Sequence, residues 1–275
     1  MAVHSESLFH FTRSIDGLLG ILRNGFYPYY CPEVHVWQED PFKVLQCAAH
    51  PMVCFCDIPL SQISIHQQTY GTYGIGMSKA WRRYFNLNPV IYCQQDAFVH
   101  EAIGDIMPMY RQLEKAGLDN NKIKKWGLKD DVAFVMGFAK LLQLPSLVKL
   151  IEGPVFIKER NDWDTKLTPF YREREWRIVP DFRLVHGILD TVVDISTYSD
   201  PIKRNKINKK AEKFSLSVFV RNWSDIQYII LSKDAEVPDF IKEFTIICKD
   251  KGLTNDQIQI LLTRVKTSER IQLDY

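Results

Sequence analysis

The chain of 275 residues is long enough to bury a substantial core, as one large domain or two small ones. Its composition, 46% hydrophobic and 25% charged, is that of an ordinary soluble globular protein, and the net charge of +2 is too small to indicate nucleic acid by itself. No apolar run approaches the roughly 18 residues of a membrane span, and the N-terminus lacks a secretion signal. We therefore expect a cytoplasmic protein without a membrane partner.

The six cysteines are too few for a disulfide scaffold, so we expect reduced thiols. Four of them lie in one region with two histidines: Cys31, Cys47, Cys54, Cys56, His35 and His50. Their spacings match no common pair of zinc ligands. Alternation along a strand would place Cys54 and Cys56 on one face, where buried thiols behave as small apolar residues. The sequence therefore predicts no metal site.

The first third of the chain alternates strand and helix signals. Ser14 is a candidate N-cap, and Asn24-Gly25 supplies the residues that end a helix. The expected elements are strand 7–12, helix 15–24, an irregular proline-containing loop 27–50, strand 52–56, a helix from about 61, strand 74–78, a helix start at 79–84 and strand 89–93.

Residues 96–150 show apolar residues at helical spacing and no strand signal, which predicts a helical insertion. Beyond it the expected elements are strands 153–159, 173–180, 215–220 and 227–232, an exposed basic loop 194–213 and an amphipathic helix 238–249. The segment IQILLTRV (258–265) fits either a strand or the end of a second helix. The predicted class is a single α+β domain over residues 1–275.

Three polar signals follow one another along the strands. His10 lies mid-strand in LFHFT, Tyr70 and Tyr73 flank a glycine-rich turn, and Glu173 and Glu175 occur two apart in EREW. Each has a structural interpretation: a core histidine, turn and core tyrosines, and a solvated ladder of acids and arginines on an exposed edge strand. Their order along the chain also fits a ligand cleft with strand-borne groups.

Three segments carry a specific family resemblance. MVCFCDIPLSQI, YGTYGIGMSKAW and FYREREWRIVP together resemble the AbiGi family of abortive phage-resistance proteins, which is commonly described as the antitoxin half of a two-gene system. LFHFT followed by SIDGLLGILRNGF, and the EREW strand, also resemble the ADP-ribosyltransferase superfamily in its His-Tyr-Glu form. This second resemblance implies a split mixed or antiparallel sheet and NAD as the substrate.

The transferase resemblance implies two catalytic roles. Glu175 would stabilise the oxocarbenium-like ribose that forms as nicotinamide leaves, and Glu173 would orient or deprotonate the acceptor. The residues that it would place around NAD are His10, Thr12, Arg13, Tyr70, Tyr73 and Gly74. Among these, His10 would bind the adenosine-side ribose and Tyr73 would stack on nicotinamide, with Tyr70 as the rival. Arg13 would meet a phosphate, and Gly74 would let backbone approach.

Two other functions compete with NAD chemistry. The first is a non-catalytic antitoxin or sensor that binds a cognate toxin or a phage-derived protein. The second is a nucleic-acid-binding module that uses the basic segment Lys203–Lys213 together with KAWRRY. Loss of NAD consumption on substitution of Glu175 would distinguish NAD chemistry from both of these functions.

Overall fold

The protein is described from a computed structural model over residues 5–38, 43–105, 140–141, 143–181, 188–219 and 222–274. Helices and strands alternate through these ranges, which confirms the α+β class. The largest sheet has seven strands in the described part of the chain, and it is mixed because β13 and β14 pair in parallel. Its strands, in spatial order, are β14 (Val265–Thr267), β13 (Ile226–Leu231), β5 (Tyr73–Ser78), β1 (Ser7–Thr12), β4 (Val53–Cys56), β11 (Glu175–Ile178) and β6 (Asn88–Pro89).

The opening of the chain folds as predicted. β1 leads into helix α1 (Ile15–Asn24), where the Ser14 side chain accepts a hydrogen bond from the amide of Gly17. Gly25 then ends the helix with φ of 89°, a value that favours glycine. Helix α2 (Ile63–Tyr70), preceded by the 3-10 turn Leu60–Gln62, fills the connection from β4 to β5.

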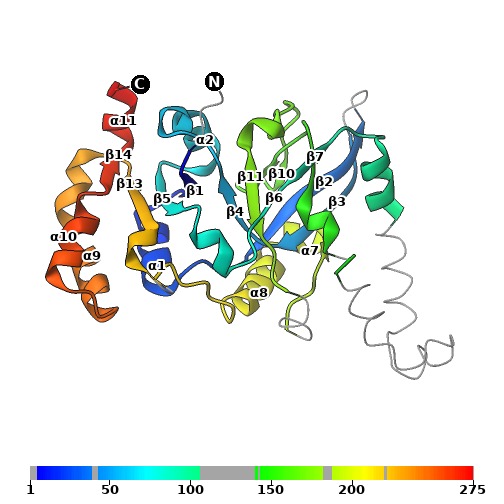
Figure 1. Ribbon diagram of the computed structural model, residues 1–275. Helices are drawn as coiled ribbons and strands as arrows, with labels where there is room; N and C mark the ends of the chain where they lie inside the picture. The colour runs from blue at the N-terminus through cyan, green and yellow to red at the C-terminus, as the bar shows by residue number, and fades with distance from the viewer. Residues whose placement is uncertain are drawn as a thin grey trace.

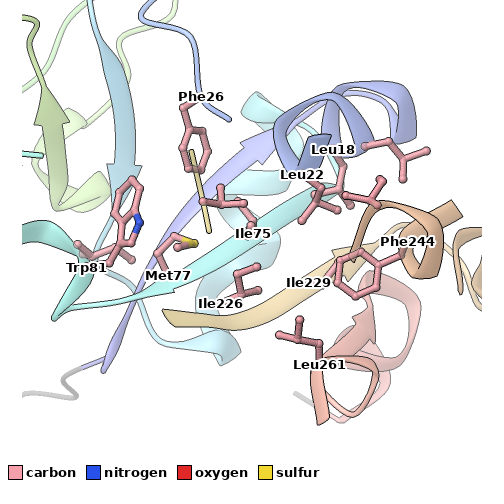
Figure 2. Packing of buried hydrophobic residues seen from close by; sticks show 14 of the residues in the cluster. Leu18, Leu22, Phe26, Ile75, Met77, Trp81, Ile226, Ile229, Phe244 and Leu261 are labelled. Atoms are coloured by element: carbon pink, nitrogen blue, oxygen red, sulfur yellow. The ribbon is translucent and has the colours of Figure 1, made fainter. Parts of the chain in front are cut away.

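The main core lies between this sheet and helices α1, α9 (Val237–Asp250) and α10 (Asn255–Leu262). Figure 2 shows Leu18 and Leu22 of α1, Ile75 of β5, Ile229 of β13 and Phe244 of α9 converging in this core. Figure 1 shows α9, α10 and α11 (Ser268–Asp274) beside β13 and β14 at one end of the molecule. The amphipathic helix and strand predicted for 238–249 and 227–232 are confirmed, and IQILLTRV divides between α10 and β14.

A second sheet replaces the predicted loop over 27–50. Strands β2 (Tyr30–Gln38) and β3 (Lys43–Pro51) form a long antiparallel pair, and β12 (Val193–Asp194) joins the outer side of β3. The loop prediction was wrong because a strand can hold a proline where no amide hydrogen bond to the neighbouring strand is required, as at Pro32. Pro32 lies opposite Ala49 in the pair.

The basic segment 194–213 is helical, so its assignment as a loop was wrong. Helix α7 (Ile195–Ser199) is followed by α8 (Pro201–Ala211). The Asp200 side chain accepts hydrogen bonds from the amides of Ile202 and Lys203, and Pro201 occupies the first turn of the helix. This Asp-Pro pair is a helix-start signal that the high charge of the segment concealed.

The predicted strand 89–93 is divided between two sheets. Asn88–Pro89 forms β6 on the main sheet, and β7 (Ile91–Cys93) pairs in parallel with β8 (Val148–Leu150). The helical insertion predicted for 96–150 is therefore wrong at its end, where β8 is a strand. Residues 98–105 and 140–141 are helical, 144–147 form a 3-10 turn, and 106–139 and 142 lie outside the described residues.

Two further predicted strands are shorter or absent. Of 153–159, only β9 (Phe156–Ile157) is a strand, paired with β10 (Asp162–Trp163). Of 215–220, the described residues make one isolated bridge, from Leu216 to Phe26. No helix within the described ranges combines the length and apolarity that crossing a bilayer requires.

Candidate active site

A cavity of about 570 Å³ opens beside the carboxyl end of β1 and the start of β11. This volume lies within the range of small-molecule pockets. Its lining includes five of the residues singled out from the sequence: His10, Thr12, Tyr70, Glu173 and Glu175. Aromatic side chains such as Phe55 and Phe156 complete the wall. Residues 165 positions apart in the chain therefore meet at one hollow.

His10 is held in the cavity wall by its neighbouring strand. Its Nδ1 lies 2.8 Å from the carbonyl oxygen of Cys54 on β4. A carbonyl only accepts, so Nδ1 carries the proton and Nε2 is left as an acceptor. Burial lowers the pKa of His10, so the ring is neutral at physiological pH. A neutral imidazole with a vacant acceptor is suited to bind a hydroxyl group.

Glu175 is the first residue of β11, and its backbone is fixed from both sides. Its amide donates to the hydroxyl of Tyr92 at 2.8 Å, and its carbonyl accepts from the amide of Val90 at 2.9 Å. On the other side of the strand, Glu175 lies opposite Cys56 of β4. The half-buried Trp176 packs against the main core, and the Arg82 guanidinium lies 5.4 Å from its ring centroid.

Glu173 does not lie in the strand, which corrects the prediction of a continuous Glu-x-Glu strand over 173–180. It ends a 3-10 turn (Phe170–Glu173), and Arg174 then adopts a left-handed conformation with φ of 47°. This turn nevertheless brings the two carboxylates together. Both accept hydrogen bonds from Lys149 Nζ, at 2.8 Å from Oε2 of Glu173 and 3.0 Å from Oε2 of Glu175.

Arg177 completes the charge cluster behind Glu175. The guanidinium is fully buried, with Nε 2.8 Å from Oε1 of Glu175 and Nη2 2.6 Å from Oε1 of Glu33. Its Nη1 donates to the carbonyl of Ser146 at 2.8 Å. Among the described residues, the cluster thus contains three carboxyl groups (Glu33, Glu173, Glu175) and two cations (Lys149, Arg177).

The surroundings of the cluster shift the pKa values of Glu175 and Glu33 in opposite directions. Burial alone would raise the pKa of Glu175, but Arg177 and Lys149 outweigh it and hold that pKa well below its ordinary value. Burial raises the pKa of Glu33, because Arg177 and Lys149 compensate it only in part. Burial would lower the pKa of Lys149, yet the Glu173 and Glu175 carboxylates raise it well above its ordinary value. Opposed carboxyl pKa values in one cavity are typical of acid–base sites.

The burial of these groups excludes the alternative of a solvated charge ladder. Glu173 and Glu175 are 8% and 6% exposed, and β11 is flanked by β4 and β6 instead of forming an edge. Arg177 pairs with Glu175 as that alternative supposed, but it does so inside the protein. Buried charges of this kind cost free energy unless they are paired, so the cluster needs each of its partners.

Of the two candidate tyrosines, Tyr70 lines the cavity and Tyr73 does not. Tyr70, the last residue of α2, lines the cavity and donates its hydroxyl to Oε1 of Glu173 at 2.5 Å. Tyr73, on β5, packs against the main core and donates its hydroxyl to Oε1 of Glu236 at 2.6 Å. Tyr73 is not among the lining residues of the cavity.

Comparison with known proteins covers most of the chain, including both glutamates and both tyrosines. Residues 24–232 match the family described as "Putative abortive phage resistance protein AbiGi, antitoxin". The chain belongs to the AbiGi family. It is 26% identical over 244 residues to the abortive phage resistance protein AbiGi of Lactococcus lactis subsp. cremoris, an alignment that covers 82% of this chain and 88% of that protein. No solved structure matches the chain.

Two other predicted site residues of this AbiGi chain lie outside the cavity lining. Arg13 is largely exposed and forms an ion pair with Glu159. Gly74 lies opposite Phe11 in the β1–β5 pair, and an added Cβ would lie 2.9 Å from the Phe11 ring. Gly74 therefore serves strand packing.

Three residues that build or support the cluster escaped the sequence analysis. Lys149 lies between apolar residues in β8, and a lone lysine in a buried strand is itself a signal of a paired charge. Glu33 was hidden within the segment expected to be a loop. Tyr92 supports Glu175 from a strand whose partner, β8, lies far along the chain.

The cysteine and histidine region holds thiols and a buried histidine pair. All six cysteines are free, and His50 Nε2 lies 3.4 Å from His35 Nε2. Within the described ranges, no three His, Cys, Asp or Glu side chains are grouped so as to hold a metal ion.

The basic segment of the AbiGi chain presents its lysines outward along α8. The exposed members are Lys203, Lys206, Lys209, Lys210 and Lys213, whereas Arg204 is buried and donates to the carbonyl of Tyr198. Nucleic-acid binding by this helix stays a prediction, for which a steep fall of affinity with salt is the test.

Proposed function

We propose that this AbiGi-family protein acts in abortive phage resistance by cleaving NAD in the cavity, with transfer of ADP-ribose to a macromolecular acceptor or to water. The observation that carries the proposal is the convergence of His10, Thr12, Tyr70, Glu173 and Glu175 on one hollow. Consumption of a host cofactor or modification of host molecules would explain why infection is abortive.

The chemistry requires negative charge next to the reacting ribose. Breaking the bond between C1′ and the nicotinamide nitrogen leaves an oxocarbenium-like sugar, and nicotinamide departs neutral with the electron pair of that bond. Glu175 is ionised, because Arg177 and Lys149 hold its pKa low. A fixed carboxylate in a cavity of low polarity stabilises positive charge far better than water does.

Other cavity residues suit recognition of the dinucleotide. The Nε2 atom of His10 can accept a hydrogen bond from a ribose hydroxyl, and Thr12 lines the same wall. Tyr70 takes the aromatic position that the resemblance assigned to either tyrosine, since the hydroxyl of Tyr73 is bound to Glu236 outside the lining. A phosphate contact from Arg13 would require exchange of its ion pair with Glu159.

The test is release of nicotinamide from NAD by purified protein, measured by mass spectrometry with cell lysate as the acceptor source. Glu175→Gln keeps the size of the side chain and one acceptor oxygen, and it removes the negative charge. We expect a loss on the order of 10²- to 10³-fold, as for other preorganised electrostatic groups. Tyr73→Phe is the matched control and should retain wild-type turnover, because Tyr73 lies outside the cavity lining.

The family description favours a second candidate, an antitoxin that binds a cognate toxin protein. It predicts a stable complex with the product of a neighbouring gene, and binding that is indifferent to Glu175→Gln. Absence of NAD binding and of nicotinamide release, even with lysate of phage-infected cells, would reject the enzymatic proposal. Co-purification of a toxin in that case would establish the antitoxin function.

A further inference from the structure

The three carboxyl groups of the cavity differ in how many of their oxygens the protein occupies. Glu173 uses both, because Tyr70 donates to Oε1 and Lys149 donates to Oε2. Glu175 also uses both, with Arg177 on Oε1 and both Lys149 and Arg177 on Oε2. Every oxygen of these two carboxylates thus already accepts from at least one protein donor.

Glu33 is different. Its Oε1 accepts from Nη2 of Arg177 at 2.6 Å, while its Oε2 has no hydrogen-bond donor among the described residues. The side chain is 9% exposed and lines the cavity. This oxygen of a largely buried carboxyl group is therefore open to the cavity, where a ligand, water or a proton can satisfy it.

We propose that Glu33 is the general base of the site, taking the proton from the hydroxyl group of the acceptor as it attacks the ribose. The inference rests on the proposed NAD chemistry and assigns to Glu33 a role that the transferase resemblance implied for Glu173. Glu173 is poorly placed for that role, because Tyr70 and Lys149 already occupy its oxygens.

The step balances without another reactant. The C1′–N bond to nicotinamide breaks, and its electron pair leaves with the ring, which becomes neutral. A bond forms between C1′ and the oxygen of the acceptor alcohol or water. The proton of that hydroxyl moves to Oε2 of Glu33 and then to solvent, so that NAD and R–OH give ADP-ribosyl–OR, nicotinamide and a proton.

The surroundings of Glu33 favour such a proton acceptor. Burial raises its pKa, and a base is most effective when its pKa approaches the working pH. The same Arg177 side chain holds Glu33 and Glu175, so one guanidinium positions both the base and the charge-stabilising carboxylate. Such a base suits an alcohol or water as the acceptor, whose proton must be removed as the bond forms.

The experiment compares wild type, Glu33→Gln and Glu33→Asp in NAD affinity and in the pH profile of kcat/KM for nicotinamide release. The glutamine keeps an acceptor for Arg177, so the fold and the affinity for NAD should be retained. Turnover should fall by about 10²- to 10⁴-fold, and the acidic limb of the profile should disappear. The aspartate keeps a titrating carboxyl group one methylene further back, so it should restore part of the rate together with the limb.

Glu173→Gln and Tyr73→Phe serve as the comparison variants. Glu173→Gln should keep the acidic limb even if its rate is lower, and Tyr73→Phe should match wild type throughout. An active wild type whose limb persists in Glu33→Gln, or moves with Glu173→Gln instead, would overturn the assignment of Glu33 alone. A wild type that binds NAD but releases no nicotinamide would overturn the proposed function and this inference with it.

Discussion

The hydroxyl of Tyr70 donates a hydrogen bond to Oε1 of Glu173 across 2.5 Å, and so joins the end of α2 to the turn that precedes β11. Glu173 is buried, and Tyr70 lines the cavity although 37% of its surface is exposed. Burial of the hydroxyl group and, after it, the charge of Glu173 raise the pKa of Tyr70. Tyr70 is therefore a neutral donor that holds one carboxylate of the charge cluster in place.

Removal of this hydroxyl should weaken both the fold and the site. We expect Tyr70→Phe to lower the free energy of unfolding by about 1.5–3 kcal/mol, the usual range for a hydrogen bond to a charged group. Turnover of NAD should fall as Glu173 loses its support. Urea denaturation and nicotinamide release measure the two effects. Tyr73→Phe is the paired control, and equal turnover losses in both variants would contradict the placement of the two tyrosines.

Arg177 should be the most sensitive charge in the protein. Arg177→Met leaves the carboxyl groups of Glu33 and Glu175 buried without their shared cation, and breaking such a buried pair costs about 3–5 kcal/mol. Arg23→Met is a matched control, because the Arg23–Glu243 ion pair is solvent-exposed and should contribute less than about 1 kcal/mol. Urea denaturation of both variants provides the measurement. A loss below 1 kcal/mol for Arg177→Met would show that the cluster is not buried as described.

The buried histidine pair predicts loss of stability in acid. Burial, then the His35 and Arg177 charges, lower the pKa of His50 to about 3, and burial and Arg177 lower the pKa of His35 to about 4. Below pH 6.5 both histidines bind protons in the unfolded chain, whereas in the folded protein they stay neutral until a lower pH. The free energy of unfolding should thus fall between pH 6.5 and 4, by up to about 1.4 kcal/mol per pH unit for each histidine. His50→Asn should make this slope shallower in urea titrations at stepped pH. Identical slopes would show that the pair does not titrate as inferred.

Gly71 should tolerate no side chain. Its φ is 114°, and an added Cβ would collide with the carbonyl of Thr12 in the cavity wall. Gly252 also has a positive φ, of 80°, but has no atom within 4 Å of an added Cβ. Gly252→Ala should therefore cost only the backbone strain of about 1–2 kcal/mol, and Gly71→Ala clearly more. Thermal unfolding compares the two, and equal losses would contradict the close approach of Gly71 to β1.

The sequence predicted those parts of the site that local signals specify. Ser14 and Gly25 bounded the first helix, strand alternation placed His10, and the Glu-x-Glu motif identified two acids of the cluster. Local signals do not predict which of Tyr70 and Tyr73 lines the cavity, because this depends on where α2 ends and β5 begins. A three-residue difference there separates a tyrosine that lines the cavity from one whose hydroxyl is bound to Glu236 outside the lining.

The remaining members depend on pairings between distant segments. Lys149 reaches the cluster because β8 pairs with β7, and Glu33 reaches it because β2 pairs with β3. Neither pairing leaves a short-range signal in the sequence, and Pro32 made a strand at β2 less expected. The charge cluster could therefore be predicted as two glutamates but not as a network with its own cations.

Ile91 lies opposite Val148 in the parallel β7–β8 pair. This pairing makes the position of the site independent of the length of chain between the two residues. Lys149 is anchored through β8 to β7, so its position depends on this strand pair and not on the length of the connection. The entropy of closing a loop rises only slowly with its length. Relatives can thus lengthen or shorten this connection ahead of Ser146, whose carbonyl accepts from Arg177, while the buried cation stays fixed. The number of residues in this part of the chain and the position of Lys149 can therefore evolve separately.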